Sequence, residues 1–264
     1  MSSRGNHAIA TIRTSQATRA ASDREPRCVL SLVVPAFDEE PNLRLLHERV
    51  TAILGTGAEW ELVLIDDGSR DGTADTIRAL VHRDPRVVGV FLERNCGQSA
   101  ALAAGAREAR GRVIATLDAD LQNDPADLPP LLAALEDWDA VVGYRLRRRD
   151  SFVRRASSRI ANAIRNWISR DDIRDTGCSL KVFRAAALHS IPWFDGMHRF
   201  LPTLLRYQGY RVLELPVSHH PRHAGRSKYG IRNRAWRAFR DLLAVRWMRT
   251  RMIRSSVREV LRAH

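Results

Sequence analysis

The sequence predicts an α/β fold in which a mainly parallel β-sheet is flanked by helices. Short apolar runs with the length of buried strands alternate with segments whose apolar residues recur at helical spacing. This alternation is typical of βαβ units. Acidic residues follow several of the expected strands, and parallel strands end at one edge of a sheet. The expected strands are residues 28–35, 60–66, 86–92, 113–117 and 139–143, and the expected helices are residues 41–50, 73–82, 98–109 and 128–135.

The first two strands illustrate the pattern. Residues 28–35 form an apolar run, and the helix after it begins near Pro41, with leucines at helical spacing. The second strand, residues 60–66, ends in Asp66 and Asp67 and is followed by a Gly-Ser turn. We therefore expect polar side chains from neighbouring strands to meet at the same edge of the sheet.

The strand at residues 113–117 runs directly into Asp118, Asp120 and Gln122. In an extended chain, residues two apart point to the same side, so these three side chains are expected to face one ligand. Two carboxylates and an amide oxygen suit Mg²⁺ or Mn²⁺. Because Mg²⁺ keeps positions open for substrate phosphates, a diphosphate is the expected second ligand. A surface loop rich in aspartate is the alternative interpretation.

The length and net charge of the chain limit the number of domains and the classes of partner that are expected. The chain has 264 residues and a formal net charge of +13, which suits one α/β domain with appendages. A basic balance indicates nucleic acid, an acidic lipid surface or anionic substrates. No zinc-finger spacing, RNP-like motif or helix-turn-helix pattern is present, so nucleic acid is not an expected partner. Three widely spaced cysteines are expected to be free thiols: Cys28, Cys96 and Cys178.

Eight motifs follow one another along the chain: VVPAFDEE, IDDGSRDGT, RNCGQSAALAAG, DADLQNDP, GYR, DTGCSLKVFR, GMHRFLP and RHAGRSKYG. In this order they resemble the polyprenyl-phosphate sugar transferases of glycosyltransferase family 2, the dolichol-phosphate mannosyltransferase type. The resemblance covers residues 30–229. It implies a GT-A (Rossmann-like) fold, a nucleotide-sugar donor of the GDP-mannose or UDP-glucose type, Mg²⁺ or Mn²⁺, a polyprenyl or dolichyl phosphate acceptor, and inversion at the anomeric carbon.

The same resemblance implies roles for single residues. The residues expected to bind the nucleotide sugar are Pro35, Phe37, Glu39, Asp66, Asp67, Asp118 and Gln122. The expected metal ligands are Asp118, Asp120 and Gln122. The residues expected at the acceptor phosphate are Arg145, Arg222, Ser227 and Lys228, and those expected to act in catalysis are Asp120, Arg222 and Lys228. Phe37 as a core aromatic and Asp67 as a turn former that caps the next helix are the alternative interpretations.

The chemistry of the acceptor also favours a polyprenyl-phosphate sugar transferase. A hydroxyl acceptor needs a general base, whereas a phosphate monoester is already anionic at neutral pH, since its second pKa is about 6. A phosphate acceptor therefore needs cations, and the acceptor half of the chain is rich in arginine. An essential Asp175 or Asp195 acting as base would instead favour a family 2 enzyme with a hydroxyl acceptor. A non-catalytic relative that binds nucleotide or lipid is a further alternative.

Two amphipathic stripes suggest contact with an anionic membrane surface, and packing of both on the domain core is the alternative interpretation. The first is Phe152, Ala156, Ile160, Ala163, Ile164 and Trp167, and the second is Trp236, Phe239, Leu243 and Trp247. No stretch has the roughly 18 apolar residues of a transmembrane helix. We therefore expect a peripheral protein on the cytoplasmic face of a membrane, with a separate integral membrane protein as a candidate partner.

The expected organisation is a single folded domain with two appendages. Residues 1–27 are expected to be a disordered tail. Residues 28–230 are expected to form the GT-A domain, with a nucleotide-sugar half at 28–143 and an acceptor half at 144–230. Residues 231–264 are expected to form a basic amphipathic helical tail.

Overall fold

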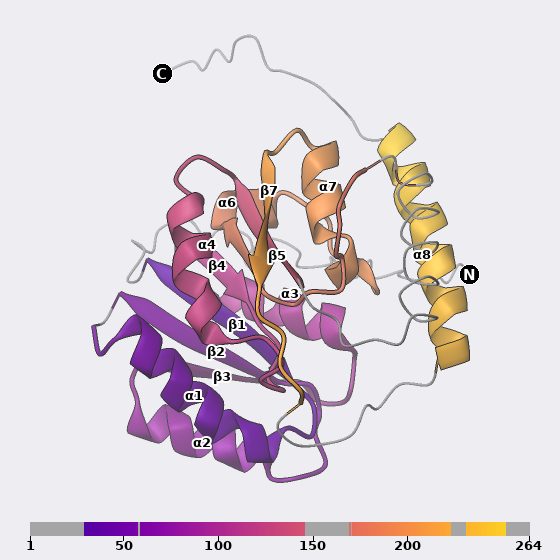
Figure 1. Cartoon of the computed structure of the whole chain (residues 1–264). Coiled ribbons are helices and arrows are strands. Elements are labelled where there is room, and N and C mark those ends of the chain that lie inside the picture. Colours follow the sequence, from indigo (N-terminus) through magenta and orange to yellow (C-terminus); the bar gives the residue numbers. More distant parts are fainter. Residues whose placement is uncertain (1–28, 58, 146–168, 170, 223–230, 252–264) are drawn as a thin grey trace, which may run out of the picture.

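The computed structural model describes residues 29–57, 59–145, 169, 171–222 and 231–251 (Figure 1). Within them, one seven-stranded sheet has helices on both faces, and its strand order is β3-β2-β1-β4-β6-β5-β7. The expected α/β architecture with a mainly parallel sheet is confirmed.

The first half of the chain consists of β-α units. Strands β1, β2, β3 and β4 pair in parallel, and each strand and helix lies within a few residues of its expected position. The chain places β2 and β3 on one side of β1 and then returns to place β4 on the other side. The elements are β1 (Leu30–Ala36), α1 (Glu40–Leu54), β2 (Trp60–Asp66), α2 (Thr73–Arg83), β3 (Val87–Phe91), α3 (Gln98–Glu108) and β4 (Val113–Thr116).

The second half extends the sheet with a change of direction. β6 runs antiparallel to both of its neighbours, β4 and β5, while β7 pairs in parallel with β5. Because β6 is reversed, its first residue lies at the edge where the parallel strands end. The elements are η1 (Pro125–Asp127), α4 (Leu128–Ala134), β5 (Ala140–Arg145), β6 (Lys181–Arg184), α6 (Ala185–His189), η2 (Met197–Arg199), α7 (Leu201–Tyr207), β7 (Val212–Val217) and α8 (Ile231–Arg251).

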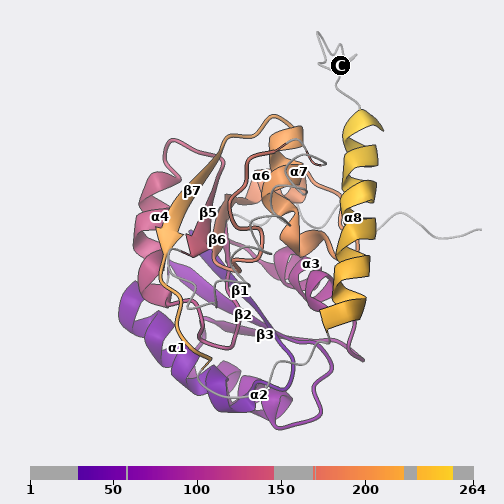
Figure 2. The same cartoon turned by 45° about the vertical axis from the view of Figure 1, so that its right-hand side comes forward.

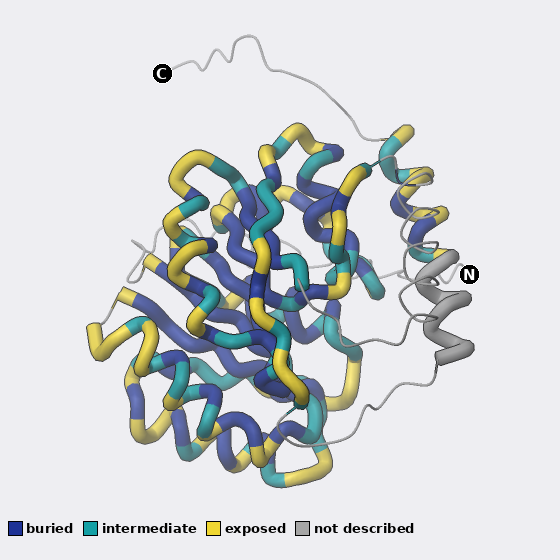
Figure 3. Tube along the Cα trace, viewed as in Figure 1, coloured by how far each residue is buried: buried dark blue, intermediate teal, exposed yellow. Residues whose placement is uncertain are grey.

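Alternating strand residues divide the core into two layers. On one face of the sheet, residues such as Leu32 and Leu64 pack with α1, α2 and α4. On the other face, residues such as Val33 and Phe183 pack with α3, α6, α7 and α8. Figure 2 shows the two groups of helices on opposite sides of the sheet, and Figure 3 shows the strands between them as buried. The order in which strands are added to the sheet reverses between β1 and β4, and open α/β sheets bind ligands at the carboxyl ends of the strands at such a point.

Helix α8 lies beside α7 in Figures 1 and 2. It attaches to the core through Leu242 and Val245, which are buried. Leu243 and Trp247 of the expected apolar stripe face outward, with 45% and 62% of their surface exposed. One expected amphipathic helix is therefore present, and these two residues of its stripe are not used for packing on the domain.

Several expectations concern other parts of the chain. The tail at residues 1–27, the stripe between Phe152 and Trp167, and the phosphate-site residues Ser227 and Lys228 lie outside the described residues. Within the described ranges, no helix is both long enough and apolar enough to span a bilayer.

Candidate active site

The loop after β4 holds the expected metal triplet, but it does not continue as an extended chain. The strand ends at Thr116, and Leu121 adopts a left-handed conformation with φ of 58°. The expected alternation of residues 118, 120 and 122 along a strand is therefore wrong. The turn bends back on itself, so that the carboxylate of Asp120 accepts a hydrogen bond from the backbone N–H of Gln122 (3.1 Å).

Asp118 lies half-buried at the end of this strand. Its Oδ1 accepts a hydrogen bond from Gln98 Nε2 at 2.7 Å, and its backbone N–H donates to Ser179 Oγ at 3.3 Å. Burial and the neighbouring Asp120 carboxylate raise the pKa of Asp118 to about 6. Nearby positive charge acts in the opposite direction and favours the Asp118 carboxylate.

Arg222 supplies part of that charge. Its Nη2 lies 2.9 Å from Asp120 Oδ2, and its Nη1 lies 3.4 Å from Glu39 Oε1. Glu39 and Asp120 are both buried, and they follow β1 and β4 respectively. Arg222 comes from the segment after β7. One guanidinium thus joins three segments that are far apart in the sequence, and it brings together three residues expected at the site.

A second cation lies near Asp118. Lys181 is the first residue of β6, lies opposite Thr116 in the β4–β6 pairing, and is only 4% exposed. Its ammonium donates a hydrogen bond to the Cys178 carbonyl, and burial lowers its pKa. The motif analysis did not assign Lys181 a role, nor Gln98. The available signal was a lysine inside an otherwise apolar strand pattern, LKVF.

The residues expected near the nucleotide lie around the ends of β1 and β2. Asp66 is buried and accepts a hydrogen bond from the Ser69 backbone N–H (3.0 Å). Pro35 is within β1, and Phe37 follows it half-buried. These side chains and Glu39 therefore lie at the carboxyl ends of β1 and β2, on the same sheet edge as Asp118 and Asp120.

Asp67 has a defined structural task. Its two carboxylate oxygens accept hydrogen bonds from the backbone N–H groups of Cys96 (2.7 Å) and Gly97 (2.9 Å), and burial raises its pKa. These contacts tie the end of β2 to the loop that starts α3. Asp67 makes no cap contact with α2, the next helix. The alternative interpretation of Asp67 as a cap of that helix is therefore wrong, because its carboxylate binds the loop before α3 instead. A direct contact with the nucleotide stays a prediction.

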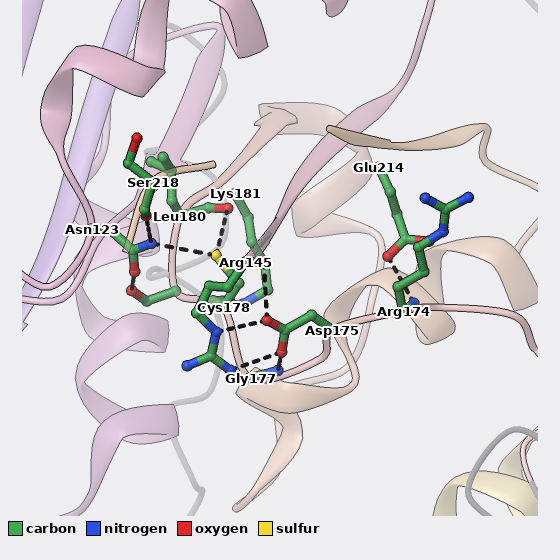
Figure 4. A network of polar contacts seen from close by, with 11 residues as sticks. Asn123, Arg145, Arg174, Asp175, Gly177, Cys178, Leu180, Lys181, Glu214 and Ser218 are labelled. Carbon is green, nitrogen blue, oxygen red and sulfur yellow. Dashed lines mark hydrogen bonds and ion pairs between the residues drawn. The ribbon is translucent and has the colours of Figure 1, made fainter. Parts of the chain in front are cut away.

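Arg145 and Asp175 form a two-pronged ion pair. Arg145 Nε and Nη2 lie 2.7 and 2.8 Å from the two carboxylate oxygens of Asp175, and Figure 4 shows the two groups facing each other. Asp175 also accepts a hydrogen bond from the Gly177 backbone N–H at 3.0 Å. A carboxylate held in this way by charge-assisted contacts is poorly suited to act as a general base. Asp195, the other candidate base, is exposed in the segment before η2.

The oxygen set fits a small divalent cation. Asp118 and Asp120 provide carboxylates at one edge of the sheet, and Gln122 provides an amide. Burial, and after it the charge of Asp120, raises the pKa of Asp118, and a bound cation would favour its charged form. The part of the chain that the structure describes holds no cluster of three or more His, Cys, Asp or Glu residues that could bind a metal ion.

Comparison with known proteins identifies the family. Residues 31–191 match the family model described as glycosyl transferase family 2. The chain belongs to this family. It is therefore a glycosyltransferase, and the resemblance to polyprenyl-phosphate sugar transferases is confirmed by its relatives.

Two curated relatives and one solved structure are informative. The chain is 42% identical over 239 residues to a dodecaprenyl-phosphate galacturonate synthase of Rhizobium johnstonii, covering 88% of this chain and 70% of the relative. It is 37% identical to an undecaprenyl-phosphate 4-deoxy-4-formamido-L-arabinose transferase of Edwardsiella ictaluri, covering 76% of this chain and 63% of the relative. A mannosyltransferase of Pyrobaculum calidifontis, solved with GDP-mannose and Mn²⁺, shares the fold with a TM-score of 0.59 at 21% identity, over 89% of this chain and 67% of that one.

Replacing Asp67 by alanine tests its contacts with the loop before α3. Hydrogen bonds to charged groups contribute about 1.5–3 kcal/mol each, so we expect the free energy of unfolding to fall by about 2 kcal/mol or more. The amides of Cys96 and Gly97 should then exchange hydrogen faster. Asp137→Ala, at an exposed aspartate, is the control and should change stability by less than about 0.5 kcal/mol. Unchanged exchange at both amides would contradict the assignment.

Proposed function

We propose that the protein transfers a sugar from a nucleotide-sugar donor to a polyprenyl phosphate, with inversion, at the cytoplasmic face of a membrane. The observation that carries the proposal is the contact of Arg222 with Asp120 and Glu39, which joins the metal motif to the basic motif at one edge of the sheet. Family membership and the acceptors named for the relatives, dodecaprenyl and undecaprenyl phosphate, support the same reaction.

In this proposal, Asp118, Asp120 and Gln122 bind Mg²⁺ or Mn²⁺. The bound ion would supply positive charge to the donor diphosphate. Pro35, Phe37, Glu39, Asp66 and Asp67 bind the nucleotide from the ends of β1 and β2. Arg222 adds a guanidinium beside the diphosphate, and Ser227 and Lys228 of the same motif contribute further phosphate contacts.

The acceptor phosphate provides the nucleophile. One of its oxygens forms the new bond to the anomeric carbon while the bond from that carbon to the diphosphate oxygen breaks, and the nucleoside diphosphate leaves. A phosphate monoester that is already ionised needs no base to remove a proton. Arg145 is the proposed cation for this phosphate, oriented by Asp175. The work of the protein in this step is therefore to position two anionic groups and to neutralise them.

Transfer of labelled sugar to a short-chain polyprenyl phosphate in detergent tests the reaction directly. GDP- and UDP-sugars are offered with Mn²⁺ or Mg²⁺, and labelled lipid is the product. Asp120→Asn and a chelator should each lower the transfer rate at least about 100-fold, because both remove electrostatic stabilisation of the leaving diphosphate. Asp137→Asn serves as the matched control and should retain activity. Nucleotide binding without labelled lipid would favour the non-catalytic alternative, and transfer to a soluble sugar would favour a hydroxyl acceptor.

Replacing Asp175 by asparagine distinguishes a phosphate acceptor from a hydroxyl acceptor. If it orients Arg145, Asp175→Asn should raise KM for the lipid phosphate about 10-fold, since a charge-assisted contact is weakened, and should change kcat much less. A general base would instead be lost, with a fall in kcat of about 10²- to 10⁴-fold. Asp172→Asn is the matched control, because Asp172 is an exposed neighbour that pairs with Arg206. A large loss of kcat with unchanged KM would contradict the phosphate-acceptor reaction.

The outer face of α8 supports action at a membrane surface. Leu243 and Trp247 are exposed one helical turn apart, and the guanidinium of Arg251 lies 5.9 Å from the centre of a Trp247 ring. Arg240 and Arg246 are also exposed on this helix. Apolar and aromatic residues interleaved with cations are typical of helices that lie at a bilayer interface.

Vesicle sedimentation tests this surface. Trp247→Ser should reduce binding to vesicles that contain phosphatidylglycerol by about 10-fold, since it removes a large apolar side chain that is 62% exposed. Added salt should weaken binding further, because cations contribute to it. Phe91→Ser, at an exposed aromatic residue on the edge strand β3, is the matched control and should leave vesicle binding unchanged. Equal effects of the two substitutions would rule out α8 as the binding face.

A further inference from the structure

Asn123 is a buried amide in the turn that carries the expected metal ligands. It directly follows Gln122 and is only 5% exposed. No role was expected for it from the motifs. A buried amide loses its hydrogen bonds to water and needs partners within the protein, so its contacts show which segments it joins.

The side chain of Asn123 contacts the segment before β6. Its Oδ1 accepts a hydrogen bond from Ser179 Oγ at 2.9 Å, and the same hydroxyl accepts one from the Asp118 backbone N–H at 3.3 Å. The Ser179 hydroxyl therefore links the amide of Asn123 to the backbone of Asp118. The amide nitrogen of Asn123 lies 3.6 Å from Cys178 Sγ, a thiol whose pKa is raised by burial (Figure 4).

A third segment, the one after β7, also reaches this amide. Asn123 Nδ2 lies 3.5 Å from the backbone carbonyl oxygen of Ser218 (Figure 4), and the His220 backbone N–H donates to the Gln122 carbonyl at 2.8 Å. Because a carbonyl oxygen can only accept, this contact assigns the amide nitrogen to the Ser218 side and the amide oxygen to Ser179. One side chain thus joins three segments.

The turn held by these contacts is strained. Leu121 has a φ of 58°, a left-handed conformation that costs energy at a residue other than glycine. Such a conformation persists where the surrounding structure holds it. Asn123 lies two residues after Leu121, so its contacts with separate segments are well placed to hold the turn.

We propose that Asn123 is a positioning residue that holds the metal turn, residues 118–123, against the segment before β6, and that it thereby sets the metal affinity and the alignment of the acceptor with the donor. That segment contains Asp175, the partner of Arg145. Asn123 therefore connects the expected metal ligands with the proposed acceptor site. The inference rests on the proposed sugar transfer and names a residue that aligns its two substrates.

Mn²⁺ titration followed by electron paramagnetic resonance tests the effect on the metal and needs neither donor nor acceptor. Asn123→Ala and Ser179→Ala should each raise the Kd for Mn²⁺ about 10-fold, because partners that orient metal ligands contribute about 10- to 100-fold to affinity. The double variant should fall well short of the product of the two effects, since both remove the same hydrogen bond. An unchanged Kd in both single variants would overturn the inference.

Two further variants distinguish positioning from a general loss of stability. Ser179→Thr keeps the hydroxyl and should retain most of the Mn²⁺ affinity. Ser190→Ala is the matched control, because it removes a hydroxyl that donates to the Ala187 carbonyl at 2.7 Å at the end of α6. It should leave the Kd for Mn²⁺ unchanged. An equal rise of the Kd in Ser190→Ala would contradict a specific role of Asn123.

Transfer kinetics test the alignment of the substrates. At saturating Mn²⁺ and donor, Asn123→Ala should lower kcat about 10-fold, since a small displacement of the turn misaligns the reacting groups. KM for the lipid phosphate should change little, because the Asn123 amide contacts protein groups. Full recovery of kcat at saturating Mn²⁺ would overturn the alignment role.

Hydrogen exchange separates failure of the inference from failure of the proposed reaction, because it needs no ligand. Asn123→Ala should speed exchange of the Asp118 and His220 amides at least about 10-fold. The Cys96 amide, which Asp67 binds, is the internal control and should keep its rate. Faster exchange at both amides in a protein that binds no Mn²⁺ would uphold the hold on the turn and contradict the proposed metal chemistry. Unchanged exchange would overturn the inference even if sugar transfer were observed.

Discussion

Two aspartates at the end of one strand, Asp118 and Asp120, impose the constraint around which this edge of the sheet is built. Burial raises the pKa of Asp118, and repulsion from the neighbouring Asp120 carboxylate adds to the rise. The surrounding polar groups relieve that repulsion from different directions. Gln98 donates from α3, Arg222 contacts Asp120 from the segment after β7, and Lys181 brings an ammonium from β6. Removing one of these partners would leave negative charge poorly compensated.

The reversed strand β6 explains how the sheet brings a lysine to this place. In a wholly parallel sheet, the carboxyl edge collects only the last residues of strands and the loops after them. Because β6 runs the other way, its first residue and the DTGCS segment before it lie at the same edge as Asp118. Ser179 accepts a hydrogen bond from the Asp118 backbone N–H and donates one to Asn123 Oδ1, so that this segment also holds the turn that carries the acids.

The sequence predicted the first half of the fold well because its strands are apolar and its helices have clear periodicity. The β-α units up to β5 lie close to their expected positions. β6 and β7 were not predicted, since Lys181 interrupts the apolar pattern of a four-residue strand, and β7 is partly exposed with a proline in it. Short helices such as α6 and α7 carry too few turns to give a period.

The site was predictable in its composition and less so in its contacts. Motifs identified Asp118, Asp120 and Arg222, and the structure brings Arg222 to the acid pair. No motif encodes the pairing of Arg145 with Asp175 or the loop contacts of Asp67, because these depend on how separate loops meet in space. The extended geometry expected for the metal loop failed because Leu121 adopts a left-handed conformation, which pattern analysis does not detect at a non-glycine residue.

Lys181 also bears on how the chain finds its register. β6 pairs with a neighbour on each side, and its successive residues Val182 and Phe183 enter opposite layers of the core. A slip of one residue against β4 and β5 would move the lysine from the site into the apolar layer that Val182 occupies. An unpaired ammonium in that layer would cost several kcal/mol, so misregistered sheets are strongly disfavoured. The lysine at the site therefore also helps to select the correct pairing register of β6 in the central sheet.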